Sequence, residues 1–218
     1  ESFGKASALF NGFMHIFEDH RNRLPVSARA LKSWLRMGFQ NEGAPVPFEA
    51  VGLVLIDLFS EGKLYEGGAV LLQLDGWLRE QDWGMLRAAD LAESPSGELT
   101  LTLGRRERGE KVKTGSNQGV VISWGVTKAV MRAFRRGCSR DELIFPVSQD
   151  KYRKAWHRAL QRSGLPCFGP PHALRHAGAS AFIAAGGCLE AARRKGRWQT
   201  TAALQRYTKV HVLVEQQS

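Results

Sequence analysis

The chain has 218 residues, of which 43% are hydrophobic and 24% charged. It can therefore bury one sizeable core, or one core plus a smaller appendage, and this composition without a low-complexity tract predicts a soluble, globular chain. No apolar run approaches the roughly 18 residues that a membrane-spanning helix takes, and the opening ESFGKASALFNGF lacks the basic-then-apolar order of a secretory signal.

The cysteines and the first residue each give one expectation about the chain. The three cysteines, Cys138, Cys167 and Cys188, are far apart and show no C-x-x-C spacing, so they indicate neither a disulfide framework nor a zinc knuckle, and we expect a reducing, intracellular setting. Because the chain opens on Glu1 rather than methionine, we expect a fragment of a longer polypeptide.

The formal net charge of +10 is concentrated in the last third of the chain. Residues 1–150 hold 19 basic and 19 acidic side chains, whereas residues 151–211 hold twelve basic side chains against the acid Glu190. The basic third is also apolar and periodic, so it predicts a folded cationic surface whose partner is a nucleic acid. A basic surface that serves solubility or binds an acidic protein is the alternative.

The predicted elements begin with two amphipathic helices at residues 6–20 and 27–37. The segment NEGAPVP that follows marks a linker or domain edge. Beyond it, residues 48–59 and 67–78 are apolar enough for buried helices, and GWLREQDWGML interrupts this pattern as a polar turn.

The middle of the chain predicts the strands. ELTLTL at residues 98–103 and GVVIS at residues 119–123 have strand character, and a short third strand is expected at residues 110–113 within the turn-rich RRERGEKVKTGSNQ. Helical patterns then cover residues 125–136, 150–163, 171–185, 189–195 and 200–207. The predicted fold class is α+β, mainly α-helical, with one small three-stranded antiparallel sheet.

The segment GPPHALRH carries the first candidate site. Pro170 and Pro171 suit the first turn of a helix, and His172 and Arg175, three residues apart, would share a face near its N-terminus, where the helix dipole favours anions. His176 lies about 100° away, so it is expected to pack inside or bond to backbone. A zinc site at His172 and His176 is disfavoured, because no Glu lies between them and no third ligand is evident.

Taken together, DGWLREQDWGMLRAADL, VKTGSNQGVVI, HALRH and KGRWQTTAALQRY resemble the catalytic domain of tyrosine recombinases, the phage-integrase and Cre-like family, over residues 48–211. Arg79, with Asp82, Leu86 and Asp90 at the family spacing, resembles the arginine turn. The remaining catalytic positions match Lys113 in the hairpin, His172 and Arg175 in H-x-x-R, Trp198 at the His-or-Trp position and Tyr207 as the nucleophile.

The resemblance implies a site-specific DNA recombinase or integrase from a mobile element, with a catalytic domain at residues 46–218 and a remnant of a helical DNA-clamping region at residues 1–45. Its implied partners are double-stranded DNA and further copies of the chain in a tetramer, and it would act with DNA inside the cell, in the nucleus if eukaryotic. No cofactor, metal or membrane is implied. Flanking phosphates would be contacted by Arg105, Arg106, Arg108, Arg193, Arg194, Lys195, Arg197 and Arg206.

The implied chemistry explains why these residue types recur. Arg79 and Arg175 would clamp the scissile phosphate, because a guanidinium is permanently charged and forks onto two oxygens. His172 would assist proton transfer, Trp198 would donate its indole N–H to a phosphate oxygen, and Lys113 would protonate the leaving 5′-oxygen. Tyr207 would form a 3′-phosphotyrosine, which stores the energy needed for rejoining without ATP.

Three departures from the family pattern are visible. Asp82 stands where the family usually has Glu, so it must buttress Arg79 with a shorter side chain. Arg197 intervenes between Gly196 and Trp198, where the family commonly has glycine directly before the His-or-Trp position. Eleven residues follow Tyr207, which is short for a segment that docks on a neighbouring copy.

Several alternatives remain open from the sequence. The chain could relax DNA as a type IB topoisomerase does, be an inactive DNA-binding module derived from a recombinase, or bind nucleic acid in general. Lys111 competes with Lys113, although the Thr-Gly after Lys113 favours the latter. Arg79 could simply pair with Asp75 or Asp82, Trp198 could be a core aromatic, and Tyr207 could be an ordinary helix-face residue.

Overall fold

The structure, a computed structural model, describes residues 3–17, 24–37, 45–110, 112–113, 115–205 and 208. The chain divides into two units, Glu1–Glu42 and Gly43–Ser218. This division lies close to the domain edge expected at residue 45, whereas the DNA-clamping origin of the first unit stays a prediction. Within the described ranges, no helix has the length and apolar character that crossing a bilayer takes.

The first unit contains two helices that pack against each other, α1 (Phe3–Ile16) and α2 (Pro25–Met37). Pro25 begins α2, where the missing N–H of proline is not needed and its fixed φ suits the first helical turn. Both helices were expected, with start and end residues that differ by a few positions.

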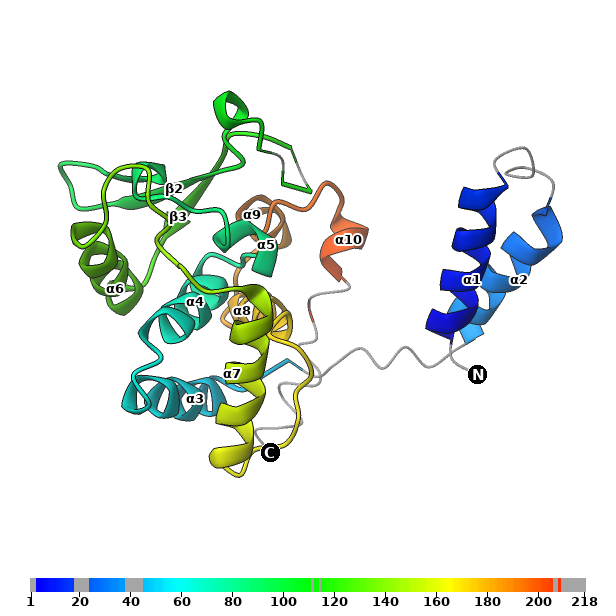
Figure 1. The fold of residues 1–218 in the computed structure, drawn as a ribbon, viewed down its shortest axis with the longest axis horizontal. Helices are drawn as coiled ribbons and strands as arrows, with labels where there is room; N and C mark the ends of the chain where they lie inside the picture. Colours follow the sequence, from blue (N-terminus) through cyan, green and yellow to red (C-terminus); the bar gives the residue numbers. More distant parts are fainter. Residues whose placement is uncertain are drawn as a thin grey trace. The chain divides into compact units, whose positions relative to one another are not determined.

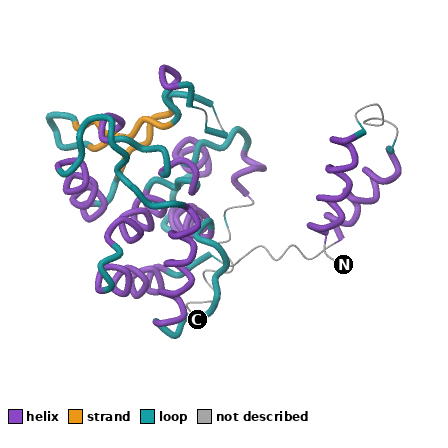
Figure 2. Tube along the Cα trace, viewed as in Figure 1, coloured by secondary structure: helices purple, strands orange, loops and turns teal. Residues whose placement is uncertain are grey.

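The second unit is mainly helical, with one sheet at its edge (Figures 1 and 2). Its elements in chain order are α3 (Phe48–Ser60), α4 (Leu64–Asp75), α5 (Glu80–Trp83), the 3₁₀ turn η2 (Ala88–Asp90), β1 (Leu91–Glu93), β2 (Leu99–Leu103), the 3₁₀ turn η3 (Arg106–Arg108), β3 (Gln118–Ile122), α6 (Gly125–Arg136), α7 (Gln149–Arg162), α8 (Ala173–Ala184), α9 (Leu189–Lys195) and α10 (Thr201–Gln205). The predicted fold class is therefore confirmed.

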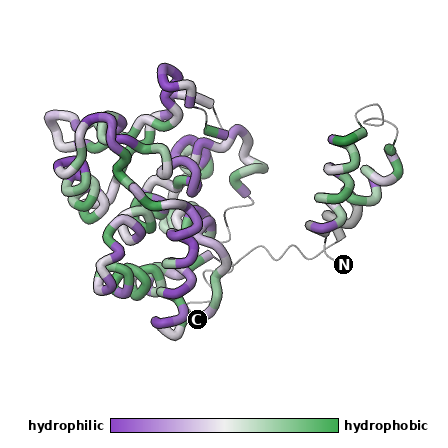
Figure 3. The backbone as a smooth tube through the Cα atoms, viewed as in Figure 1, coloured by the Kyte–Doolittle hydropathy of each residue, from purple (hydrophilic) through white to green (hydrophobic). Residues whose placement is uncertain are grey.

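Helix α4 is the centre of this unit. Every residue from Gly67 to Asp75 is buried, and the helix packs against α3, α6, α7 and α8. The hydrophobic colouring of α3 in Figure 3 fits a helix that presents Val51, Val54 and Leu58 to this core. Because α4 is enclosed on several sides, its C-terminal end and the turn that follows are held in place, and that turn carries Arg79.

The sheet has the order β1-β2-β3 and is antiparallel throughout, but its third strand is not where we expected it. The additional strand is β1, in which Leu91 pairs with Leu101 of β2. Val112 makes only an isolated bridge to Gly115 in a tight turn. The prediction of a strand at residues 110–113 is therefore wrong. Gly104 and Gly109 have a left-handed backbone, which turns the chain there. The alternation of Lys and Val in the sequence gives no sign of these turns.

Helix α8 approaches α4 closely at Gly178. A Cβ atom there would lie 2.6 Å from the carbonyl oxygen of Leu74 and 2.5 Å from Nε1 of Trp77. The close approach brings the helix that follows His172 against the turn that precedes Arg79, so a glycine is required for packing rather than for backbone conformation.

We predict that Gly178→Ala lowers the free energy of unfolding by about 1–3 kcal/mol, because the added methyl group overpacks a contact with backbone. Gly52→Ala is the matched control. Gly52 lies inside α3, and a Cβ atom added to it would have nothing within 4 Å, so this change should stabilise by about 0.5–1 kcal/mol through helix propensity. Urea unfolding of both variants measures the contrast, and equal stabilities would contradict the close approach.

Candidate active site

The turn between α4 and α5 places Arg79. Trp77 has a left-handed backbone (φ 47°), unusual for a residue with a side chain, and Arg79 then caps α5. The backbone N–H of Arg79 donates to Oδ2 of Asp82 at 3.0 Å. The side chain of Arg79 is half-buried, and within the described residues its buried Nη1 has no hydrogen-bond partner.

The two acids that could have paired with the guanidinium of Arg79 are used elsewhere. Asp75 is fully buried and accepts the backbone N–H groups of Ser123 (3.2 Å) and Trp124 (2.9 Å) at the β3–α6 junction. Lys195 approaches the same carboxylate at 3.8 Å. Asp82 accepts the amide of Arg79 rather than its guanidinium, so a cationic donor is left inside the site.

Gln73 holds the turn before His172 and was missed by sequence reasoning. It is fully buried in α4, its Nε2 donates to the carbonyl oxygen of Pro171 at 3.0 Å, and Tyr152 of α7 donates to its Oε1 at 2.7 Å. Burial raises the pKa of Tyr152 well above its ordinary value, with the charge of Glu80 adding to the effect, so the phenol remains a donor. A lone amide inside an apolar helix was the one sequence signal for this role.

Arg175 and Trp198 are the buried residues of the candidate site, and they contact each other. Arg175 is fully buried and donates to the carbonyl oxygens of Trp77 and Gly196, and its guanidinium lies 4.6 Å from the ring centre of Trp198. Trp198 is 5% exposed and packs 5.9 Å from Trp77, centre to centre. A Cβ atom on Gly196 would lie 1.7 Å from the Trp198 ring, which explains the glycine.

The pKa of His172 shows that several of the predicted catalytic cations lie near one another. Its pKa is lowered to about 4, first by burial and then by the charges of Arg175, Arg79 and Lys113, while Asp82 acts in the opposite direction. These four charged residues come from three separate segments of the chain, around residues 79–82, 113 and 175. The structure therefore brings Arg79, Lys113, His172 and Arg175 within electrostatic reach of one another, and His172 is neutral at pH 7.

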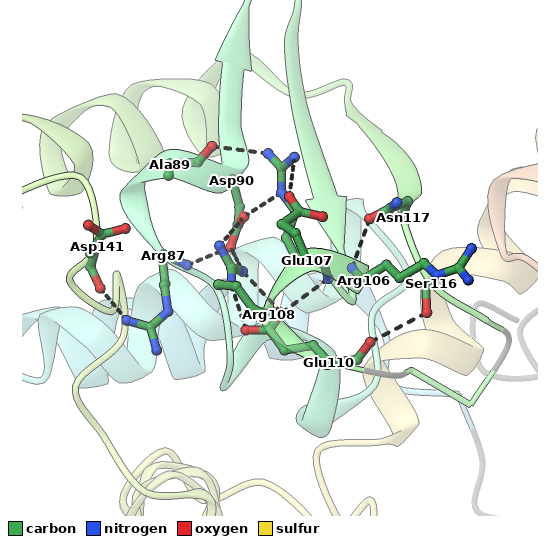
Figure 4. A network of polar contacts seen from close by, with 11 residues as sticks. Arg87, Ala89, Asp90, Arg106, Glu107, Arg108, Glu110, Ser116, Asn117 and Asp141 are labelled. Atoms are coloured by element: carbon green, nitrogen blue, oxygen red, sulfur yellow. Dashed lines mark hydrogen bonds and ion pairs between the residues drawn. The ribbon is translucent and has the colours of Figure 1, made fainter.

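The hairpin that carries Lys113 is anchored by Asp90, which is 1% exposed (Figure 4). Asp90 accepts the backbone N–H of Arg87 (2.9 Å), Nε of Arg105 (2.9 Å) and Nη2 of Arg108 (2.7 Å). Arg108 also donates to Glu110 at 2.8 Å, and these partners raise its pKa. Burial would raise the pKa of Asp90, but the hydrogen bonds from these arginines lower it overall.

Several predicted DNA contacts take part in interactions within the chain. Besides Arg105 and Arg108, both Arg193 and Arg194 pair with Glu190, at 2.8 and 3.0 Å. Lys195 lies 5.0 Å from the ring centre of Trp77.

Arg106 is exposed, and the side chain of Arg197 is 7% exposed, between α5 and α9. Their phosphate-binding roles stay predictions. Arg206 and Tyr207 lie outside the described residues.

The two histidines of the H-x-x-R-H segment lie against each other. Their rings stand edge to face, 5.4 Å apart, and both are half-buried. The expectation that His176 packs inside or bonds to backbone stays a prediction. Within the described ranges, no three His, Cys, Asp or Glu side chains gather as metal ligands would.

The helical unit with its small three-stranded sheet is the fold of a tyrosine recombinase catalytic domain. No protein-family model matches the sequence, and no curated protein does. Among solved structures, the chain is similar to XerA recombinase, with a TM-score of 0.62 and 12% identity over 87% of this chain and 71% of that chain.

Two further likenesses are to proteins solved in complexes. The Tn1549 transposon integrase in complex with circular intermediate DNA gives a TM-score of 0.67 and 12% identity over 99% of this chain and 77% of that one. The XerH site-specific recombinase bound to its palindromic difH substrate gives 0.60 and 12% over 77% of this chain, which spans half of the XerH chain. At such identities the likeness establishes the fold.

We predict that Asp90→Asn lowers the free energy of unfolding by about 2–3 kcal/mol, because it removes the charge that two partly buried guanidiniums share. The loss should be present above pH 4 and shrink below it: the folded pKa of Asp90 lies below its ordinary 3.8, so its contribution disappears as pH falls through that pKa. Asp150→Asn, which breaks an exposed pair with Lys154, should cost under about 0.5 kcal/mol. Equal losses in urea unfolding would contradict the anchoring role.

We predict that the imidazole of His172 titrates near pH 4 in NMR spectra, since burial and three cations oppose its protonation. In the unfolded chain it titrates near 6.5. Between these values the unfolded state binds a proton that the folded state does not, so stability falls as pH drops from 6.5 to 4. His172→Gln should reduce this pH dependence, and a folded midpoint near 6.5 would contradict the assembled cluster.

Proposed function

We propose that this chain is a site-specific DNA recombinase or integrase that cleaves and rejoins strands through a 3′-phosphotyrosine. The observation that carries the proposal is the buried Nη1 of Arg79, which has no partner within the described residues and belongs to the cation cluster around His172. A buried donor on a permanently charged group is costly to leave unpaired, so the site is suited to an anion.

A phosphodiester fits these groups better than a carboxylate or a simple anion would. Like charges from Arg79, Lys113 and Arg175 raise one another's energy at close range in a partly buried site, and a phosphate that becomes more negative during reaction offsets them most in the transition state. Arg79 supplies the open donor, while Arg175, held beneath by two carbonyl groups, contributes charge and steadies Trp198.

The reaction divides among the residues as follows. The Tyr207 oxygen attacks phosphorus and gives up its proton, which neutral His172 is suited to accept. The bond from phosphorus to the 5′-oxygen breaks, and Lys113 gives that oxygen a proton. A 5′-hydroxyl reverses these steps, because the phosphotyrosine conserves the broken bond's energy.

The partner that we propose is double-stranded DNA. The Tn1549 integrase was solved with circular intermediate DNA and XerH with its difH substrate, and this chain has the same fold and a net charge of +10. Arg106 and Arg194 are exposed near the site-bearing elements, and such contacts set affinity and its salt dependence rather than sequence choice.

One observation favours a second candidate, an inactive DNA-binding module. The guanidinium of Arg175 is fully buried and donates to two backbone carbonyls, so in this conformation it serves the fold. If that arrangement persists on DNA, binding would continue without cleavage.

We predict that the wild-type chain forms a covalent adduct with a nicked suicide DNA substrate, detected by denaturing electrophoresis. Tyr207→Phe should bind the same DNA with unchanged affinity and give no adduct, since it lacks only the nucleophilic oxygen. Arg79→Ala should slow adduct formation by about 10²–10³, the cost of losing one transition-state donor.

Three outcomes separate the candidates. DNA binding without an adduct in the wild type identifies the inactive module and refutes the proposal. An adduct together with supercoil relaxation, but without exchange between two sites, identifies a type IB topoisomerase activity. An adduct with strand exchange supports the recombinase.

A further inference from the structure

The two residues at which this chain departs from the family pattern are in contact. Asp82 and Arg197 form an ion pair, with Nη2 of Arg197 3.5 Å from Oδ2 of Asp82. Both side chains are buried, at 2% and 7% exposure. The same Oδ2 accepts the backbone N–H of Arg79 at 3.0 Å, so one carboxylate oxygen links the two arginines.

Arg197 also binds the part of the turn that precedes Arg79. Its Nη2 donates to the carbonyl oxygen of Trp77 at 3.2 Å, and its Nη1 donates to that of Gly76 at 3.3 Å. A third contact joins Nη1 to the carbonyl oxygen of Lys195 at 3.4 Å. One guanidinium therefore fastens the turn that bears Arg79 to the end of α9, directly before Trp198.

This arrangement is costly, which argues for a purpose beyond packing. Burial lowers the pKa of Arg197 to about 10, the charge of Asp82 opposing and that of Arg79 adding to the shift. Its Nε is buried without a partner among the described residues, and its backbone has φ 56°, the left-handed region that favours glycine. An apolar residue or glycine would satisfy the fold at lower cost.

We propose that Arg197 and Asp82 form a substitute buttress for Arg79, with Arg197 as a positioning residue. Asp82 fixes the backbone of Arg79 after the turn, and Arg197 fixes Asp82 together with the carbonyl oxygens before it. The guanidinium of Arg79 is then held with Nη1 open toward the substrate phosphate. This inference rests on the proposed function for its substrate, although the clamped turn itself is observed.

The compensating pair of variants gives the sharpest test. Arg197→Gly removes the guanidinium and adds no backbone strain, since glycine accepts positive φ freely. Single-turnover adduct formation should fall about 100-fold, the cost of a small misplacement at the reacting centre. DNA affinity should change by less than about threefold, because a side chain that is 7% exposed is little available for a phosphate contact. Asp82→Glu alone should also slow the reaction, because the longer carboxylate meets Arg197.

The double variant Asp82→Glu with Arg197→Gly should recover at least about tenfold of the rate lost in Arg197→Gly. There the longer carboxylate enters the space vacated by Arg197 and reaches Arg79 directly. Arg132→Gln is the matched control: it breaks a guanidinium–carboxylate pair with Glu93 (2.6 Å) on α6 and β1, and its adduct rate should equal that of the wild type.

Hydrogen exchange at the Arg79 amide, followed by NMR, measures positioning without requiring activity. Exchange should be at least about tenfold faster in Arg197→Gly, because the acceptor Asp82 loses its anchor, and unchanged in Arg132→Gln. Unchanged exchange in Arg197→Gly, or a double variant no faster than Arg197→Gly, overturns the inference. A wild type that forms no adduct refutes the proposed function instead, and the exchange result then decides the buttress by itself.

Discussion

The carbonyl oxygen of Trp77 is the point on which the candidate site depends. It accepts hydrogen bonds from Arg175 of α8 and, at 3.2 Å, from Arg197 after α9, and Trp77 itself has a left-handed backbone. Positive φ costs about 1 kcal/mol or more in a residue with a side chain. That cost is offset in part by the hydrogen bonds that this one carbonyl accepts from two buried guanidiniums, so the strained turn and the arginines support each other.

Three buried aspartates organise the surrounding positive charge, and each makes the same two kinds of contact. Asp75, Asp82 and Asp90 all accept backbone N–H groups at a junction between elements and also pair with a cation. A carboxylate bound in this way fixes backbone position as well as charge. The result is a set of backbone junctions fixed by acids around the candidate site, while Arg79 keeps one buried donor without a partner in the described part of the chain.

Sequence reasoning located the longer helices because a buried stripe at helical period requires little knowledge of the partner, but it expected only a turn where the structure has α5. It also selected residues that the structure gathers, since Arg79, Lys113 and Arg175 all act on His172. It failed for β1, whose three residues carry too little pattern, and it could not foresee the pairing of Arg105, Arg108 or Arg197. A basic residue reads the same in a sequence whether it faces solvent or a buried carboxylate, because the pairing depends on tertiary contacts.

The depth of burial divides the cations into two groups with different consequences. Arg175 and Arg197 are almost wholly enclosed and use their donors on carbonyl oxygens, so changing either disturbs the frame as well as the charge. Arg79 is half-buried, and Lys113 is exposed on a hairpin anchored through Asp90. Preorganised charge is effective only if its supports do not move as the substrate's charge develops. The enclosed Arg175 and Arg197 meet that requirement, and the charges of Arg175, Arg79 and Lys113 keep His172 neutral, as the reaction that we propose requires of a proton acceptor.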